Sequence, residues 1–316
     1  MDNKYIIIIL LAIALLFPLF AGSYFIHIFT TIFVFLSLSL SWDMMLRTGQ
    51  LSFGTAGFFG LGAYASVIAV LKLGWNPLFS ILIGGIFAGI IAFLLGFVVL
   101  KLRLIYFSIT TLALTHVFSV IIRNMSDLTG GASGLTLNSA IFSGNPLKIY
   151  YLILFLTLVV ILVSEYFKRS KIHFAINSIR NDEVTAKSSG IDVFKYMLLV
   201  FVITSIIQGV IGAVYAQQYA FVEPESTFSL NFLLLPIAMA LVGGIYSTNG
   251  PIIGAILLGV ISEYLKLIMP YGHLIVYGLI IVLVVLFMPS GIYKPLKNKL
   301  ITKNIGGDNY AQSANK

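Results

Sequence analysis

Long apolar runs separated by short polar segments dominate the sequence. The runs 78–100 and 150–163 contain no charged residue. A bilayer core about 30 Å thick requires roughly 20 apolar residues in a helix, and backbone groups within lipid must find their hydrogen bonds inside the segment. The runs do not alternate between apolar and polar residues, as the strands of a membrane barrel do. The pattern therefore predicts an all-α, polytopic integral membrane protein.

The hydrophobic pattern predicts about ten membrane-spanning helices. The first run follows Lys4 and is longer than the apolar core of a signal peptide, so we expect it to be retained as a helix. Pro236 is expected to kink or interrupt its span. The predicted spans cover residues 5–21, 26–46, 54–71, 78–100, 105–123, 149–167, 195–216, 231–247, 251–268 and 272–289.

Composition agrees with this class, and the charges give the chain an orientation. The chain is 59% hydrophobic and 9% charged, whereas a soluble domain carries roughly 25% charged residues. The net charge of +8 comes from residues between the runs and near the end, without a basic groove, so it indicates topology rather than nucleic-acid binding. Placing both termini in the cytoplasm puts 15 of the 19 Lys and Arg residues inside. We therefore expect a transmembrane domain at 1–293 and a basic cytoplasmic tail at 294–316.

The residues that catalysis or metal binding requires are missing or scattered. The chain has no cysteine, which excludes thiol chemistry and Cys-ligated metals. Its four histidines, His27, His116, His173 and His273, show no metal-ligand spacing. No zinc-protease, nucleophile-elbow or phosphate-binding loop motif occurs. We expect neither an enzyme nor a metal site, and no cofactor on this chain.

The segment 168–194 is the one sizeable polar connection predicted on the cytoplasmic side. Asn181 can cap a helix whose first turn holds Asp182 and Glu183, and Gly190 can end it in the left-handed conformation. A helix of roughly two turns is unstable alone in water. It must dock on its own membrane domain or on a partner, and an ordinary surface helix between two spans remains the alternative.

The segment 49–64 is unusually rich in small residues. Ser52, Ala56 and Gly60 recur at every fourth position, which would let another helix approach closely. The glycines also weaken the helix, and broken helices at membrane depth are tolerated where they line a cavity. Tight packing alone and a break that lines a pathway both remain open. The candidate pathway residues are Gln50, Ser52, Gly54, Thr55, Gly57 and Gly60.

His116 is the ionisable residue closest to the middle of a predicted span. Such a residue is a candidate functional group, although a neutral imidazole bonded to a neighbouring helix would serve structure alone. The charged residues near span ends are expected to reach water: Asp43, Glu165, Glu263 and Lys266.

Five segments resemble, in the same order, one family of membrane proteins. They are GQLSFGTAGFFGLGAY at 49–64, LRLIYFSITTLA at 102–113, TGGASGL at 129–135, AINSIRNDEVTAKSSGI at 175–191 and FMPSGI at 287–292. The sequence is similar to the branched-chain amino acid permeases of bacterial ABC importers, specifically the LivM-type subunit. Thr55 stands where the family pattern has His, and Ser290 where it has Arg.

This resemblance implies an ABC importer permease fold that forms half of a membrane pathway. The partners would be a LivH-type sister permease, two ATP-binding cassette ATPases that bind ATP and Mg, and an external solute-binding protein. The location would be the bacterial cytoplasmic (inner) membrane. The solute could be a branched-chain amino acid, another amino acid, urea or a short amide.

The resemblance also assigns roles to residues. Glu223 and Glu225 would face the binding protein, although plain solvation explains them equally well. A stand-alone proton-coupled transporter using His116 is the alternative from another class, and the absence of a second mid-membrane ionisable partner counts against it. The residues expected to couple to the ATPase are Arg180, Asp182, Glu183, Ala186 and Gly190.

Overall fold

The computed structural model describes residues 14–269 and scattered positions between 276 and 295. Within this part of the chain, eight helices are long and apolar enough to cross a membrane. Each overlaps one of the predicted spans, which confirms the all-α membrane class. The remaining predicted spans, 5–21 and 272–289, and the tail 294–316 lie largely outside the described residues.

Seven of the eight spans are single helices, and the remaining one combines α12 with the short α11 before it. The long helices are α2 Ser23–Leu46, α3 Thr55–Leu73, α4 Pro77–Val99, α5 Ile105–Asn124, α7 Pro146–Arg169, α10 Val193–Tyr219, α12 Asn231–Gly243 and α13 Asn249–Ile268. The shorter elements are α6 Ser126–Thr129, η1 Gly131–Ser133, β1 Leu135–Thr136, η2 Ile141–Gly144, α8 Lys171–Asn181, α9 Glu183–Ser188, β2 Phe221–Val222 and α11 Pro224–Thr227.

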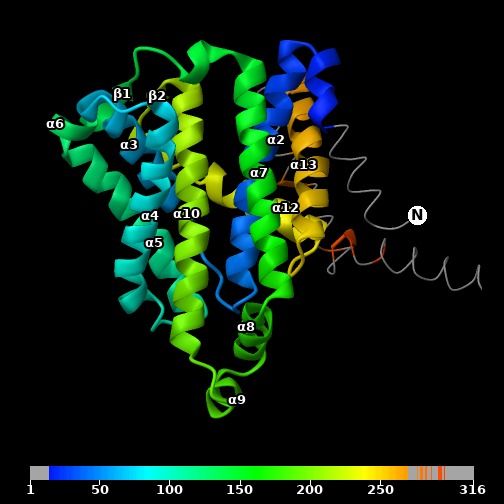
Figure 1. The fold of residues 1–316 in the computed structure, drawn as a ribbon. Helices are drawn as coiled ribbons and strands as arrows, with labels where there is room; N and C mark the ends of the chain where they lie inside the picture. The colour runs from blue at the N-terminus through cyan, green and yellow to red at the C-terminus, as the bar shows by residue number, and fades with distance from the viewer. Residues whose placement is uncertain are drawn as a thin grey trace, which may run out of the picture.

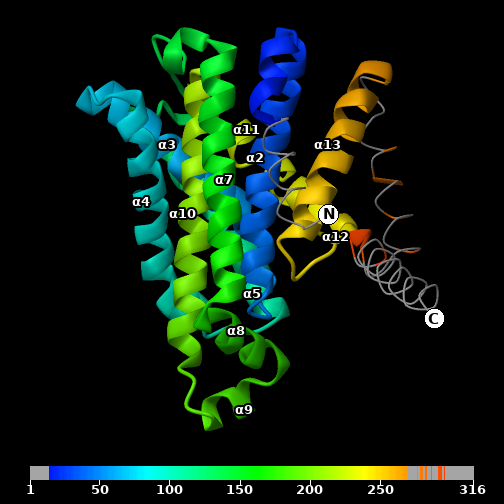
Figure 2. The ribbon, with the colours of Figure 1, turned by 45° about the vertical axis from the view of Figure 1, so that its right-hand side comes forward.

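The long helices pack around α10 and α2. Helix α10 contacts α3, α4 and α2, while α2 also contacts α7, α12 and α13. The helices α8 and α9 project from one end of this bundle, and the strands β1 and β2 lie toward the opposite end (Figures 1 and 2). The two strands pair antiparallel, with Leu135 opposite Val222, and so join the connection between α5 and α7 to the connection between α10 and α12.

Local sequence determines where two of the spans begin. At the start of α4, the side chain of Asn76 accepts a hydrogen bond from the backbone N–H of Leu78, and Pro77 occupies the first helical position. At the start of α7, Asn145 and Pro146 repeat this arrangement. Asn satisfies a free N–H of the first turn, and Pro lacks the N–H that would otherwise be unpaired there.

Small residues bring the backbones of α3 and α10 together. A Cβ added to Gly62 would lie 2.1 Å from the carbonyl oxygen of Gly209, and one added to Gly212 would lie 2.0 Å from that of Phe59. No side chain larger than hydrogen fits at such distances. Glycines therefore allow the close approach of these two helices.

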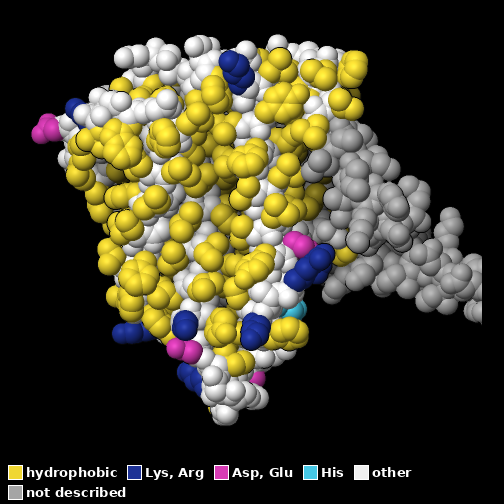
Figure 3. Space-filling view, in the orientation of Figure 1, with side chains coloured by type: hydrophobic (Ala, Val, Ile, Leu, Met, Phe, Trp, Pro, Cys, Tyr) yellow, Lys and Arg dark blue, Asp and Glu magenta, His cyan; other side chains and the backbone are white. Residues whose placement is uncertain are grey.

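The exterior agrees with a membrane-embedded bundle. Figure 3 shows one face that is largely hydrophobic through its middle, with charged side chains gathered near its two ends. On α4, the exposed residues are large and apolar, including Leu82, Ile86, Ile90, Phe93 and Phe97. Such a surface suits contact with lipid.

Candidate functional site

An irregular segment at 47–54 joins α2 to α3, in the gap between the predicted spans 26–46 and 54–71. Between Leu51 and Phe53 its backbone groups bond to side chains. The indole N–H of Trp42 donates to the carbonyl of Ser52 (2.9 Å), and Ser108 Oγ donates to that of Leu51 (2.7 Å). The N–H of Phe53 donates to Thr111 Oγ1 (2.9 Å). Ser108 and Thr111 belong to α5, so this helix supplies polar partners that the irregular segment needs.

Two of the six candidate pathway residues, Gly54 and Gly57, lie directly against α5. Gln50, Ser52 and Thr55 are buried, and a Cβ on Gly57 would lie 2.8 Å from Thr115 Oγ1. Gly60 packs instead on the ring of Phe228. The interpretation of Ser52, Ala56 and Gly60 as one helix face was wrong in one respect, because α3 begins at Thr55 and Ser52 precedes it.

The predicted cytoplasmic helix forms as α9, but its cap is Asp182 rather than Asn181. One carboxylate oxygen of Asp182 accepts from the N–H groups of Val184 (2.8 Å) and Thr185 (3.2 Å). The other accepts from the Thr185 hydroxyl (2.7 Å). These bonds, first that from the Thr185 side chain, hold the pKa of Asp182 below its usual value. Gly190 follows the helix with a φ of +81°, as expected.

Asn181 ends a separate helix, α8, which sequence reasoning missed. The buried residues of α8 are Ala175, Ile176 and Ile179, whose spacing is the signal that could have predicted the helix. Because α8 occupies the chain up to Asn181, the capping role passes to the next residue with a short acceptor side chain.

Two of the predicted coupling residues, Glu183 and Arg180, attach the segment that contains α8 and α9 (the α8–α9 loop) to the rest of the membrane domain. Glu183 bonds to Arg103 (2.7 Å), which precedes α5, and to Lys187 (2.8 Å). Partial burial raises the pKa of Glu183, but the bonds from Lys187 and Arg103 outweigh it and hold the pKa below its usual value. Arg180 lies over the ring of Tyr246, 4.2 Å from its centre, and bonds to Asn177 (2.6 Å).

The outward surface of α8 and α9 carries exposed apolar side chains instead of ion pairs. Ala186 is buried, whereas Phe174 and Val184 expose 72% and 74% of their surface. Large apolar side chains this exposed at a charge-rich end of the molecule are candidates for contact with another protein.

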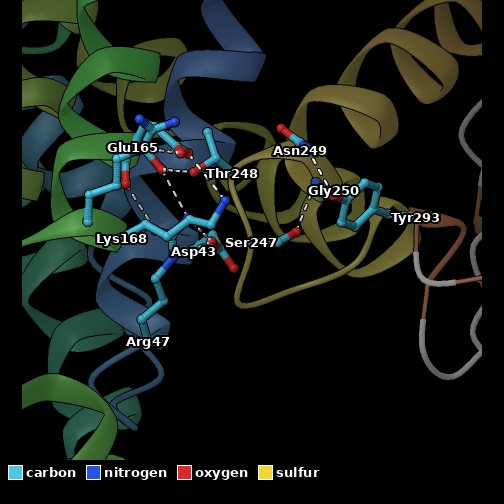
Figure 4. A network of polar contacts seen from close by, with 11 residues as sticks. Asp43, Arg47, Glu165, Lys168, Ser247, Thr248, Asn249, Gly250 and Tyr293 are labelled. Carbon is cyan, nitrogen blue, oxygen red and sulfur yellow. Dashed lines mark hydrogen bonds and ion pairs between the residues drawn. The ribbon is translucent and has the colours of Figure 1, made fainter. Parts of the chain in front are cut away.

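A buried polar network lies near the same end and was not predicted. Asp43 pairs with Arg47 (2.8 Å) and accepts from the N–H of Tyr246 (2.6 Å). Arg47 donates to Ser164 Oγ (2.9 Å), which contacts the hydroxyl of Thr248 (3.0 Å). Figure 4 shows how this network joins α2, α7 and the connection before α13. Removing one partner of a buried ion pair costs about 3–5 kcal/mol.

The expectation that Asp43 reaches water was therefore wrong, because its side chain has 0% exposure. The four-residue spacing from Asp43 to Arg47 was the available signal for a helical ion pair. Glu165, by contrast, is partly exposed and bonds to Arg169 (2.9 Å) and Lys168 (3.4 Å), as a residue near a span end can.

His116 lies on the exposed side of α5. None of the hydrogen bonds among the described residues involves it, so the structural alternative of a bond to a neighbouring helix finds no partner in this part of the chain. The described residues also hold no group of His, Asp and Glu that could bind a metal.

The two predicted external carboxylates lie at the end opposite α9. Glu225 is 87% exposed and lies 3.6 Å from the guanidinium of Arg123 at the end of α5. Glu223 is half-buried and precedes α11. Both flank the β1–β2 pair.

Comparison with known proteins identifies the family. A family model described as branched-chain amino acid transport system / permease component matches residues 24–285. The chain is 28% identical over 332 residues to the high-affinity branched-chain amino acid transport system permease protein LivM of Escherichia coli (strain K12), covering 96% of this chain and 77% of that protein.

Two further relatives broaden the group. The chain is 25% identical over 288 residues to a probable branched-chain amino acid transport permease protein LivM of Methanocaldococcus jannaschii, covering 81% and 83% of the two chains. It is 27% identical over 276 residues to the L-arabinose transport system permease protein AraH of Escherichia coli (strain K12), covering 80% of each. No solved structure matches significantly. Because the family model spans most of the sequence, the chain belongs to the branched-chain amino acid transport system permease component family.

Proposed function

We propose that this chain forms half of the membrane pathway of an ATP-driven importer for branched-chain amino acids or related small solutes. It would pair with a LivH-type sister permease, two ATP-binding cassette ATPases and an external solute-binding protein. ATP and Mg would be bound by the ATPases, and both termini would lie on the cytoplasmic side of a bacterial inner membrane. Family membership and the names of the LivM relatives support this proposal.

The main structural support for the proposal is the way in which the α8–α9 loop contacts the membrane domain while exposing apolar side chains. The loop is tied to the connection before α5 through Glu183 and Arg103, and to the connection before α13 through Arg180 and Tyr246. It still exposes Phe174 and Val184 outward. An ATPase bound to these side chains could therefore move two separate parts of the membrane domain at once. Such rigid-body motions underlie alternation between outward-open and inward-open states.

The solute is not fixed by the fold, since the relatives include permeases named for branched-chain amino acids and for L-arabinose. The stand-alone proton-coupled alternative gains no support, because none of the ion pairs among the described residues involves His116. Such a carrier would also have no need of a partner-docking loop.

Reconstitution in liposomes distinguishes the ATP-driven importer from the stand-alone proton-coupled transporter. We expect no uptake by the purified chain alone in liposomes, and ATP-dependent uptake once the sister permease, ATPases and binding protein are added. Proton-driven uptake by the lone chain would overturn the importer proposal.

The docking surface is tested by Val184→Asp, with Val184→Leu as the matched control. An acidic residue near the start of α9 suits the helix dipole, so the loop should keep its fold. We expect Val184→Asp to reduce the amount of ATPase that co-purifies at least tenfold, and Val184→Leu to retain it. Equal ATPase recovery with both variants would remove Val184 from the docking surface.

A further inference from the structure

Among the membrane-spanning helices of the described residues, α5 is the least covered by the rest of the protein. Only 22% of its most apolar 18-residue stretch is buried, against 67% for α3 and for α10. The buried residues Ser108, Thr111 and Thr115 lie on the side that meets α3 and the irregular segment. The opposite side exposes Ile109, Ala113, His116, Val117 and Val120.

His116 is too deep in the span to reach water along the helix. At 1.5 Å per residue it lies about 16 Å from Ile105 and about 12 Å from Asn124. An imidazole is shorter than either distance, and ionisable side chains at such depth almost always face a protein interior or a water-filled cavity. A face that carries His116 is therefore not built for lipid.

The neighbouring α4 shows what a lipid-facing surface looks like in this protein. Its exposed residues at the same depth are Ile86, Ile90, Phe93 and Leu94, and none carries a polar atom in its side chain. Because the two helices are consecutive in the chain, we attribute the difference between their exposed residues to the different surroundings that the two faces meet in the membrane.

The ends of α5 lie against the two surfaces that transport must connect. At the α9 end, Arg103 bonds to Glu183 of the loop proposed to bind the ATPase. At the other end, Arg123 pairs with Glu225 beside the β1–β2 strands. A face running between these ends, open along its length and polar at its middle, has the position that a pathway between two permease chains requires.

We propose that the outer face of α5 meets the homologous second permease chain, and that His116 faces a polar group or water at the seam between the two chains. This inference rests on the proposed function, which supplies the second chain. It adds which helix forms the seam and which residue makes the seam polar at mid-membrane depth.

Cross-linking tests the position of this face. The chain has no cysteine, so Ala113→Cys can be labelled uniquely with a benzophenone maleimide in membranes that contain both permeases. Ile90→Cys on α4 is the matched control. After illumination we expect an adduct with the second permease from position 113 and at least tenfold less from position 90. Adducts with lipid alone, with a second copy of this chain or within this chain at position 113 would overturn the proposal.

Substitution of His116 tests the polar role. We expect His116→Leu to lower ATP-dependent uptake by the full complex at least tenfold, and His116→Gln, which keeps a hydrogen-bonding side chain, to retain about half or more. The thermal unfolding of the isolated chain should be the same for both variants. Equal uptake by the Leu and Gln variants would contradict the polar role. Failure of the wild-type complex to use ATP would refute the proposed function alone, because the adduct at position 113 forms without transport.

Discussion

Helices α4 and α5 follow one another in the chain, and the rest of the protein leaves most of each helix uncovered. Only 39% of the most apolar stretch of α4 and 22% of that of α5 are buried. Their exposed residues nevertheless differ in kind. On α4 they are large and apolar throughout, whereas α5 places His116 and the small Ala113 at mid-depth. Exposure alone therefore does not identify a lipid-facing surface in this protein. The polarity of what is exposed at mid-membrane depth separates the two faces.

The inner faces of the two helices differ as well. Gly85 and Gly89 bring α4 close to α10, since added Cβ atoms would lie 2.4 Å from Val210 Cγ2 and 2.5 Å from Ile206 Cγ1. Helix α5 packs through the buried rings of Phe107 and Phe118, and its hydroxyl groups also bond to an irregular segment. The inner face of α4 is therefore marked by glycine contacts to another helix, and that of α5 in part by side-chain bonds to irregular backbone.

The largest effect is expected when a charge is placed on the outer face of α4. Ile90→Lys puts an ammonium group at the centre of a lipid-facing span, at a cost of about 3 kcal/mol. His116→Lys is the matched change on α5, and in the assembled complex it should cost less than about 1 kcal/mol because that position faces a polar seam. The measurements are the yield in the membrane fraction and the thermal unfolding of the complex. Similar losses for the two variants would mean that both faces meet lipid.

A smaller effect separates the two sides of α5 itself. Thr111→Val removes the hydroxyl that accepts from the N–H of Phe53, and an unpaired buried donor costs about 1–3 kcal/mol. Thr110→Val is the control, because Thr110 is half-buried at the edge of the outer face and its replacement should change stability by less than about 0.5 kcal/mol. Unfolding of the purified chain with increasing denaturing detergent compares the two. A Thr111→Val variant as stable as the control would show that the irregular segment does not depend on α5.

The spans were predictable from sequence because a helix in lipid satisfies its own backbone. The connection between α2 and α3 was predictable as the gap between the apolar runs 26–46 and 54–71. The partners of the broken segment were not, since Thr111 lies 58 residues beyond Phe53 in the chain. Only the fold brings these two residues together.

The errors at the candidate site have the same cause, since they depend on contacts that only the fold creates. Asp43 was expected to reach water because it lies near a span end, but its second partner, Tyr246, is 203 residues away. Asn181 and Asp182 are both good capping residues, and the choice between them depended on α8, whose short apolar pattern was overlooked. Glu183, expected to couple to an ATPase, also bonds to Arg103 of this chain, and a partner 80 residues away could not be read from the sequence.

The smallest effect on stability is expected at the connection between α4 and α5, where Arg103 bonds to Glu183. The two side chains are 39% and 26% exposed, and an ion pair this open to solvent contributes about 0–1 kcal/mol. Arg103→Ala and the matched Lys187→Ala each remove one partner of Glu183, but only the first cuts the link from α9 to α5. We expect both variants to unfold like the wild type, and only Arg103→Ala to lower the solute carried per ATP several-fold.

The pH dependence of this link follows from the lowered pKa of Glu183. A carboxylate with a depressed pKa contributes its stabilisation above its unfolded value of about 4.5 and loses it as the pH falls through the lower folded value. The solute-to-ATP ratio of the wild type should therefore not change between about pH 6 and 8 through this group. A ratio that falls as the pH is lowered from 8 to 6, while the ratio for Arg103→Ala remains flat, would show that Glu183 titrates near neutrality and would contradict its lowered pKa. If Lys187→Ala lowered the ratio as much as Arg103→Ala, the coupling would depend on the charge balance of α9 and not on its attachment to the helix at the seam.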